Sequence, residues 1–349
     1  MKTKFFSGIK TFLGCSGINQ ASRSVKNDDS GRWCVFTSAG DYNNVMSWLS
    51  GLKDRPWDLI VAFYGDDDSK YRELRSVAKH IFREKGSKCQ NLKKLYSHNP
   101  NIFDNYDLIL VSDDDFILRP IDITRLFEIA AEAGFWVCSP AFSTEGRISH
   151  DIMIWAGLES IYRTVTFLEI SAPLFRADKL REFLAVYDGQ LAGWGIDWWF
   201  CSHFGAGRDG RLAIIDDVVF WNPRDDQRSG GRREITKLQS DEDRRAHWVE
   251  TAERIGIKEF DQKVLSQLFR TTGPLTVNNK LRAGSEFIRL FPTGRDYSKD
   301  KRPDLLRDVA RIHIVLGNRD EAKRLLEIAL VERSNSPWIR KLLDQLISR

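Results

Sequence analysis

The sequence predicts an α/β protein with a doubly wound mixed sheet, mostly parallel, and flanking helices, followed by a small all-α region. Three short apolar segments, residues 33–37, 58–64 and 108–111, have the composition of strands buried on both faces. Helical patterns separate these segments, and such alternation is typical of an open sheet with helices on both faces. From residue 303 onwards the pattern is wholly helical, which predicts the all-α region.

The first half of the chain contains three predicted strands and their helices. Trp33–Thr37 is a compact strand that ends in the turn Ser38–Asp41, and Asp58–Tyr64 is a second strand that ends in an acidic turn. A helix is predicted over Tyr71–Phe82. The third strand runs directly into three aspartates, and the pattern predicts a helix over Ile121–Ala133 after it.

The second half is predicted to add strands and helices of less regular order. Strands are expected at Phe135–Cys138, Thr164–Ile170 and Leu212–Asp216, and helices at Ala177–Tyr187 and Trp248–Phe269. Neither GxGxxG nor GxxxxGK[ST] occurs, so the dinucleotide fingerprint and the P-loop are not supported.

Three regions are predicted along the chain. Residues 1–32 form a basic, amphipathic segment and a polar linker, residues 33–272 form the α/β domain, and residues 273–349 form the α-helical region. Thr, Gly, Pro and Asn residues from 271 to 279 mark the boundary. Small and apolar residues at 309–329 have the spacing of one tetratricopeptide-like helix pair, which is either a structural cap or a protein-binding surface.

Composition and cysteine usage indicate the compartment. A net charge of +4 is too small to indicate nucleic acid, and no apolar run approaches the ~20 residues that span a bilayer. The five cysteines lack CxxC spacing, which argues against a disulfide framework or a zinc site and fits a reducing cytoplasm. Residues 1–14 place several apolar side chains on one helical face, which fits a helix on the inner face of an anionic membrane or one docked on the protein.

Three consecutive carboxylates, Asp113, Asp114 and Asp115, end the third strand. Ligands of open α/β sheets bind outside the carboxyl ends of the strands, and oxygen ligands suit hard cations such as Mg²⁺ and Mn²⁺. The triplet therefore predicts a metal and ligand site. The alternative is a solvated acidic turn before the next helix.

A second candidate site is Gly193-Trp-Gly-Ile-Asp197. The glycines permit a turn, and Asp197 lies where a helix begins among large aromatic residues. A carboxylate held against indole rings loses water and gains basicity, which suits a general base. Trp194, Trp198 and Trp199 offer flat apolar faces on which a ligand ring could stack, or are core aromatics.

Basic residues near these sites have two interpretations as well. Residues 224–245 contain several arginines and form either solvated surface or a mobile basic lid over an anionic ligand. Lys88, Lys93 or Lys94 would add positive charge beside a bound anion, or would simply be surface lysines.

In their order, these motifs resemble the glycosyltransferase-like family named domain of unknown function 707. The matching stretches are Tyr106-Asp107 with Asp113–Asp115, then Phe167–Phe175, Gly193–Asp197 and Ile214–Asp216. The resemblance covers roughly residues 33 to 224 and implies the GT-A fold of nucleotide-sugar glycosyltransferases. It implies that Asp115 binds Mn²⁺ or Mg²⁺, that Asp113 lies towards the donor ribose or sugar, and that Asp197 is the general base.

One position departs from this family pattern. Relatives carry a histidine shortly after the Ile-Ile-Asp strand, where this chain has Asn222. An amide oxygen ligates a hard cation but holds a transition ion less strongly than imidazole does. The departure implies that Mg²⁺ serves as well as Mn²⁺, that metal binds only with donor, or that activity is weakened or lost.

Together these features predict a metal-dependent glycosyltransferase. It would move a sugar from a nucleoside-diphosphate sugar, with UDP favoured because it is common in this fold, to an oligosaccharide or lipid-linked glycan in bacterial surface polysaccharide synthesis. Inversion at the anomeric carbon is expected with Asp197 as base. The alternatives are a non-catalytic interaction protein and a metal-dependent phosphoesterase. The expected metal ligands are Asp113, Asp115 and Asn222. The expected donor residues are Thr37, Ser38, Gly40, Asp41, Asp66, Lys93, Asp113 and Asp114. The expected acceptor residues are Trp194, Gly195, Trp198 and Glu169, of which Glu169 is either an acceptor contact or a buried, paired structural acid.

Overall fold

The computed structural model describes most of the chain from residue 33 onwards. Residues 1–32, 51, 53, 158, 225–227, 229–234, 270–296, 298–300, 304–305, 308, 311–312, 314–317 and 348–349 lie outside the description. The predicted amphipathic segment and the predicted boundary near residue 272 fall in these ranges, so both stay predictions.

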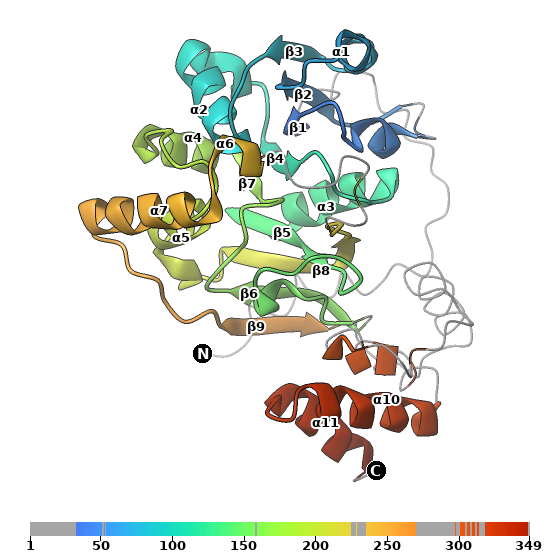
Figure 1. Ribbon diagram of the computed structural model, residues 1–349. Helices are drawn as coiled ribbons and strands as arrows, with labels where there is room; N and C mark the ends of the chain where they lie inside the picture. The colour runs from blue at the N-terminus through green and yellow to red at the C-terminus, as the bar shows by residue number, and fades with distance from the viewer. Residues whose placement is uncertain are drawn as a thin grey trace, which may run out of the picture.

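A mixed sheet of nine strands forms the centre of the described chain, in the order β3-β2-β1-β4-β7-β5-β8-β6-β9 (Figure 1). Its strands are β1 (Trp33–Ala39), β2 (Asp58–Phe63), β3 (His80–Arg83), β4 (Leu108–Asp113), β5 (Val137–Phe142), β6 (Ser160–Val165), β7 (Leu174–Arg176), β8 (Leu212–Phe220) and β9 (Val264–Phe269). β7 is antiparallel to β4 and β5, and β6 is antiparallel to β8 and β9. The other pairings, β1 with β2, β1 with β4, β2 with β3 and β5 with β8, are parallel. The carboxyl ends of β1 to β5 and β8 therefore meet at one edge of the sheet.

Helices cover both faces of this sheet. The described helices are α1 (Asp68–Arg75), α2 (Lys88–His98), α3 (Pro120–Ala133), α4 (Ala177–Val186), α5 (Ile196–His203), α6 (Ile235–Leu238), α7 (Asp241–Ile255), α10 (Arg319–Glu332) and α11 (Pro337–Ile347). Side chains at odd and even positions of a strand point to opposite faces. Trp33 of β1 stacks on Phe127 of α3, whereas Ser38 of β1 is hydrogen-bonded by Asn91 of α2. Helices α2 and α3 therefore lie on opposite faces, which confirms the doubly wound mixed sheet.

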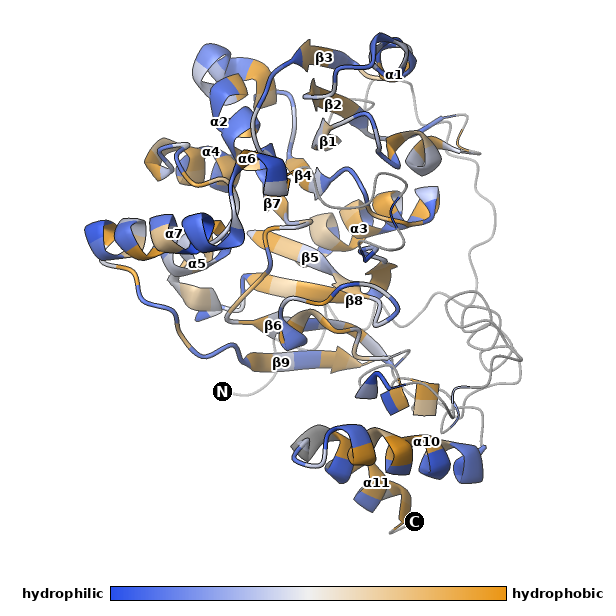
Figure 2. Cartoon of the chain, in the orientation of Figure 1, coloured by the Kyte–Doolittle hydropathy of each residue, from blue (hydrophilic) through white to orange (hydrophobic). Residues whose placement is uncertain are grey.

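The central strands are apolar because both faces are covered. Leu108–Val111 of β4 is fully buried between β1 and β7, as its unbroken apolar run predicts. Figure 2 shows hydrophobic residues concentrated on the inner strands and hydrophilic residues on the outer surfaces of α1, α2 and α7. The polar strand ends are consequently the places where charged side chains meet the interior.

Two predicted helices are partly wrong. The expected helix Tyr71–Phe82 ends at Arg75, and His80–Arg83 is instead β3, an edge strand paired with β2. The expected helix Trp248–Phe269 ends at Ile255, because Gly256 adopts a φ of 69° and terminates α7. The residues that follow include β9, which pairs with β6.

Three predicted strands have clearly different bounds in the structure. The expected strand Phe135–Cys138 begins at Val137 and continues to Phe142 as β5. The expected strand Thr164–Ile170 is shifted towards the N-terminus as β6, Ser160–Val165, and residues 166–170 lead towards β7 without strand pairing. The expected strand Leu212–Asp216 continues to Phe220 as β8.

Helices α10 and α11 lie beside one another beyond the β9 edge of the sheet (Figure 1). Ala322, Leu326 and Ala329 are fully buried, as expected for small and apolar residues between packed helices. An ion pair of 3.4 Å between Arg302 and Glu145 connects this region to the segment after β5. The tetratricopeptide-like assignment stays a prediction, since much of residues 303–318 is outside the description. In the described chain, no helix is both long and apolar enough to cross a bilayer.

Candidate active site

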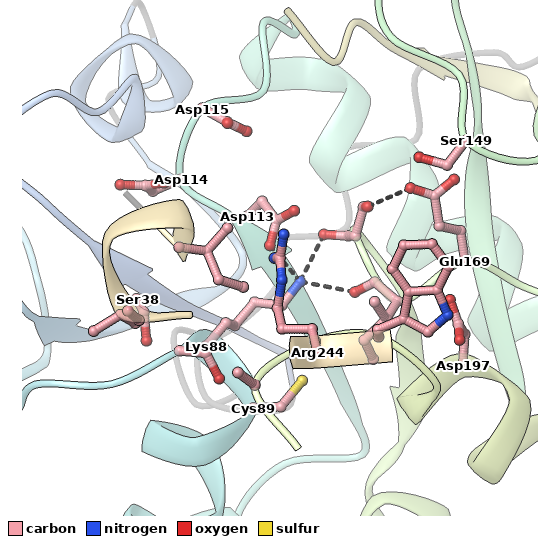
Figure 3. Close-up of a pocket in the computed structure, with 18 of the residues that line it drawn as sticks. Ser38, Lys88, Cys89, Asp113, Asp114, Asp115, Ser149, Glu169, Asp197 and Arg244 are labelled. Atoms are coloured by element: carbon pink, nitrogen blue, oxygen red, sulfur yellow. Dashed lines mark hydrogen bonds and ion pairs between the residues drawn. The ribbon is translucent and has the colours of Figure 1, made fainter. Parts of the chain in front are cut away.

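A cavity of about 690 Å³ lies at the edge where the parallel strands end (Figure 3). Its lining comes from the segments that follow β1 to β5 and β8, from the loop before β7, and from the start of α5. This volume is in the range of small-molecule sites, about 300–1,000 Å³. The topology thus brings residues that are far apart in sequence to one place, as expected for an open α/β sheet.

The turn after β1 fixes the three aspartates. The Gly40 N–H donates to Oδ2 of Asp114 over 2.9 Å, and the Asn44 N–H donates to the Asp114 carbonyl over 2.7 Å. The Asn44 side-chain amide also donates to the Asp115 carbonyl over 2.7 Å. Asp114 is buried, and burial raises the pKa of its carboxyl group to about 7, with the nearby Asp113 adding to the rise and the Gly40 N–H opposing it. Asp114 is therefore held by the protein backbone, while its neighbours line the cavity as well.

Lys88, near the start of α2, neutralises one end of this acidic cluster. Its ammonium group lies 2.8 Å from Oδ1 of Asp113 and donates to the carbonyls of Ile170 and Ser171 over 2.8 Å each (Figure 3). A longer bond of 3.3 Å reaches the Val111 carbonyl. The buried lysine thereby joins the end of β4 to the loop before β7.

The other end of the cluster faces Arg228. An antiparallel bridge between Ile117 and Trp221 brings the chain after β4 beside the chain after β8. The Arg228 guanidinium forms an ion pair with Asp115 and donates to Oδ1 of Asn222 over 3.1 Å. Asp115 and Asn222 therefore do converge, and the group between them is an arginine.

Each of the three predicted metal ligands contacts a cationic side chain. Asp113 is paired with Lys88, and Asp115 and Asn222 share Arg228. Oδ1 of Asp115 accepts no hydrogen bond from the described residues, but an ion on this oxygen would lie next to the guanidinium that binds the other oxygen. Within the described ranges, no group of three or more His, Cys, Asp or Glu side chains could hold a metal ion. The donor set in this arrangement does not fit Mn²⁺ or Mg²⁺.

Asp197 and Glu169 form a second acidic cluster across the cavity. Asp197 lies in the first turn of α5, where the Trp198 N–H donates to its Oδ1 over 3.0 Å. Burial raises the pKa of Asp197 to about 7, the Trp198 N–H lowers it, and the charge of Glu169 raises it. Glu169 is also buried and accepts a bond of 2.6 Å from the Ser171 hydroxyl. A carboxylate with a pKa near neutrality is suited to take a proton from a substrate.

Histidine 150 lies beside this second cluster. Nε2 of His150 is 4.0 Å from Oδ2 of Asp197, and burial lowers the pKa of the imidazole. The ring also lies 4.5 Å, centroid to centroid, from the ring of Phe167. His150 is therefore a neutral polar group beside Asp197 in the cavity.

The aromatic residues around Asp197 have different environments. Trp194 lines the cavity with 44% of its surface exposed, whereas Trp198 is buried against Phe167 and Phe260, with ring centroids at 4.5 Å and 5.0 Å. Trp199 packs on Tyr187 in the core. Of the three tryptophans, Trp194 is the one with a face to offer a sugar.

Five predicted donor residues lie outside the cavity lining: Thr37, Gly40, Asp41, Asp66 and Lys93. Thr37 is fully buried in β1, and Asp41 accepts bonds from the backbone N–H groups of Asp66 and Asp67. The Asp66 side chain is 88% exposed and pairs with Lys85. Lys93 donates to the Leu184 carbonyl over 2.6 Å and so ties α2 to α4.

The other predicted residues are brought together. The cavity is lined by Ser38, Asp113, Asp114, Asp115, Glu169, Trp194, Gly195, Asp197 and Trp198, and Gly40 and Asn222 support it through bonds to Asp114 and Arg228. Asp216, from the family-like Ile-Ile-Asp stretch, is a structural acid that accepts bonds from Ser160 and Arg163 in the core.

Sequence reasoning missed several lining residues. Tyr42, after β1, is 60% exposed and lines the cavity, as do Arg147 and His150 after β5. Their only sequence signal is their place just beyond a strand end. The basic lining residues are Lys85, Lys88, Arg147, Arg228, Lys237 and Arg244. This density of cations beside the aspartates is suited to an anionic ligand that also carries hydroxyl groups.

Comparison with known proteins identifies no family. No family model matches the chain, and no curated protein matches it. Among solved structures, residues 1–349 of S. aureus TarS are similar with a TM-score of 0.45 and 10% identity, over 90% of this chain and 88% of that one. The same protein in complex with UDP-GlcNAc has a TM-score of 0.42 at 10% identity, over 90% and 89% of the two chains.

GalNAc-T7, solved with UDP, GalNAc and Mn²⁺, has a TM-score of 0.44 and 12% identity, over 64% of this chain and 48% of that one. At this level of similarity, neither the ligands nor the reactions of these proteins are carried over to the present chain. The resemblance to domain of unknown function 707 likewise stays a prediction, and the family of the chain is not assigned.

Proposed function

We propose that this chain is a glycosyltransferase that moves a sugar from a nucleoside-diphosphate sugar to a glycan hydroxyl. The observation that carries the proposal is a single cavity with two chemically distinct ends. One end has Asp113–Asp115 among cations, and the other has Asp197, whose pKa is about 7. A group transfer between an anionic donor and a neutral hydroxyl requires both.

The first end fits the donor. Tyr42 offers an exposed ring beside Ser38, which suits stacking on a nucleoside base, and the aspartates can accept from ribose hydroxyl groups. The order of motifs from Asp113 to Asp197 supports the same placement through its resemblance to nucleotide-sugar glycosyltransferases. UDP is the nucleotide that this resemblance favours.

The second end fits the acceptor. Trp194 can stack on a sugar ring, while Glu169 can accept from a sugar hydroxyl. Asp197 takes the proton of the attacking hydroxyl as its oxygen bonds to the anomeric carbon. The bond from that carbon to the diphosphate oxygen breaks, and the leaving group departs with the electron pair. A single displacement of this kind inverts the anomeric configuration.

The finer parts of the proposal concern the acceptor and the setting. An oligosaccharide or lipid-linked glycan, in bacterial surface polysaccharide synthesis, remains the expectation from the sequence. The phosphoesterase alternative requires ions held by several converging carboxylates or histidines, and the described residues offer no such group of three.

A binding panel tests the proposal. Thermal unfolding would be followed with nucleoside diphosphates and nucleotide sugars, each with EDTA and with Mn²⁺. A ligand at a hundred times its dissociation constant adds about 2.7 kcal/mol of stability, which shifts the midpoint by several degrees. We expect one nucleotide to raise the unfolding midpoint of the wild-type protein, and UDP is the nucleotide that we expect.

Two exposed aromatic residues provide the matched variants. Tyr42→Ala should weaken nucleotide binding by at least fivefold, because base stacking on an aromatic ring contributes about 1–3 kcal/mol. Phe269→Ala on β9, which is 53% exposed and outside the cavity, should bind like wild type. If no nucleotide shifts the wild-type midpoint, or if Tyr42→Ala binds unchanged, the donor site is misplaced.

A further inference from the structure

We infer that Arg228 is the resident cation of this site and holds the donor diphosphate in the place where the fold family would use a divalent ion. The inference rests on the proposed function for the identity of the donor. It rests on the structure alone for the position of the guanidinium between Asp115 and Asn222.

The guanidinium is fixed by three different groups. It pairs with Asp115, and its Nη2 donates to Oδ1 of Asn222 over 3.1 Å and to the Pro223 carbonyl over 2.8 Å. The Arg228 side chain is only 9% exposed, yet the residue lines the cavity. A planar, permanently charged group held in this manner is preorganised for phosphate oxygens.

The position of Arg228 depends on the sheet. The Ile117–Trp221 bridge joins the chain after β4 to the chain after β8, so the carboxylate and the amide oxygen face one another across it. These two oxygens belong to two of the three residues that the sequence predicts as metal ligands, and the third, Asp113, pairs with Lys88. A guanidinium and a divalent ion cannot occupy this position together, because both require these oxygens and both are positive.

Two other cations of the cavity, Lys88 and Arg244, have different partners. Lys88 binds Asp113 and three backbone carbonyls, so its charge serves the fold. Arg244 forms an ion pair with Asp241 in the first turn of α7, and its guanidinium projects towards Asp113 in Figure 3. Among the described residues, Arg228 is the cation placed against two of the three predicted metal ligands, Asp115 and Asn222.

The first arm of the test measures Mn²⁺ binding without nucleotide, by calorimetry or electron paramagnetic resonance. We expect no binding to wild type at up to ~1 mM, a concentration that corresponds to about 4 kcal/mol of affinity. Arg228→Ala should gain one Mn²⁺ site, and Arg228→Ala/Asp115→Asn should lose it again. Arg224→Ala is the matched control: this neighbouring arginine donates to the Gly146 and Thr144 carbonyls outside the cavity, so its loss should leave wild-type behaviour.

The second arm uses inorganic pyrophosphate and UDP in EDTA. We expect both to bind wild type without metal and to bind Arg228→Ala at least tenfold more weakly, with Mn²⁺ restoring the variant. Arg228→Lys keeps the positive charge but lacks the forked guanidinium, so its affinity for both ligands should lie between those of wild type and Arg228→Ala. This variant replaces Arg228→Ala in the test if the alanine variant does not fold. Pyrophosphate binding without UDP binding would refute the nucleotide-sugar proposal and leave Arg228 as the diphosphate cation. Wild-type binding of pyrophosphate that needs Mn²⁺, no binding at all, or an unaffected Arg228→Ala would overturn the inference.

Discussion

Two buried carboxyl groups with similar pKa values occupy the same cavity in different ways. Asp114 and Asp197 both have a pKa raised to about 7, chiefly by burial. Oδ2 of Asp114 accepts from the Gly40 N–H and, over 3.4 Å, from the Tyr64 hydroxyl, so this acid is part of the scaffold. Asp197 lies on the side of the cavity with Trp194, where an acceptor would approach.

The base assignment predicts a specific pH dependence. Asp197 must be ionised to accept a proton, so the rate of transfer at low substrate should rise with pH up to about pH 7 and then level off. Asp197→Asn should lower kcat by about 10²–10⁴ and abolish this rise, while nucleotide affinity stays near wild type. Initial rates over pH 5–9 measure this effect, and product NMR should show inversion.

Asp114→Asn is the counterpart of that variant. This variant removes a carboxyl group of similar pKa from the Asp113–Asp115 end of the cavity. Because Asp197 is still present, its rate should still rise with pH up to about pH 7. If the rise disappears in Asp114→Asn and persists in Asp197→Asn, the assignment of Asp197 as the base is wrong. A product of retained configuration would also contradict this assignment.

At the residue scale, the acids could be predicted from the sequence and most of their partners could not. Asp113–Asp115 and Asp197 lie at the ends of recognisable elements, so position alone selects them. Lys88 and Lys93 both lie on α2, five residues apart, which rotates them by about 140° around the helix axis. Lys88 points to Asp113 and Lys93 to α4, and the helix phase that decides this is set by packing.

At the element scale, the start of α5 determines where Asp197 lies. Gly195 precedes the helix with a φ of 88°, a left-handed conformation, and packs directly against Trp248 of α7. A Cβ atom at this position would be 2.1 Å from Cδ2 of Trp248. Glycine at position 195 is thus required by both backbone conformation and helix packing.

Alanine at two glycines separates these two requirements. Gly205→Ala, at a φ of 71° with no atom within 4 Å of the new Cβ, should cost about 1–2 kcal/mol for the left-handed backbone alone. Gly195→Ala should cost about 2–5 kcal/mol, because displacement of Trp248 adds an overpacking term of about 1–3 kcal/mol. Urea unfolding measures both. Equal losses would show that α7 does not pack on this turn as described.

The strands that sequence patterns missed are those defined by distant partners. β3 has four residues with partly exposed side chains, and β9 has largely exposed ones, so neither has a buried apolar run. Each forms because β2 or β6 presents an unpaired edge. A local pattern does not contain that information, whereas the buried strand β4 is evident from its own residues.

At the scale of the whole molecule, the site exists because most of the sheet runs in one direction. The alternation of strands and helices predicts this parallel organisation and therefore the edge at which ligands bind. The insertion of antiparallel β7 between β4 and β5 is not visible in the sequence. It is this insertion that brings Glu169 and Ser171, just before β7, beside the end of β4, where Ser171 accepts from Lys88.

The two acids also make the stability of the whole protein depend on pH. Below about pH 4, Asp114 and Asp197 are neutral in both the folded and the unfolded states, so their contribution to stability is fully present. As pH rises, the unfolded carboxyls ionise first, and stability is lost until the folded groups ionise at about pH 7. The shift from 3.8 to about 7 corresponds to a loss on the order of 4 kcal/mol for each acid.

Substitution of Asp197 isolates one of these two contributions. Asp197→Asn removes its share, so the free energy of unfolding, measured with urea between pH 4 and 8, should fall less steeply with pH than in wild type. Asp261→Asn, whose side chain is 82% exposed, should keep the wild-type slope. Identical slopes for Asp197→Asn and wild type would mean that Asp197 titrates as an exposed acid. That result would contradict both the burial of Asp197 and its role as the general base.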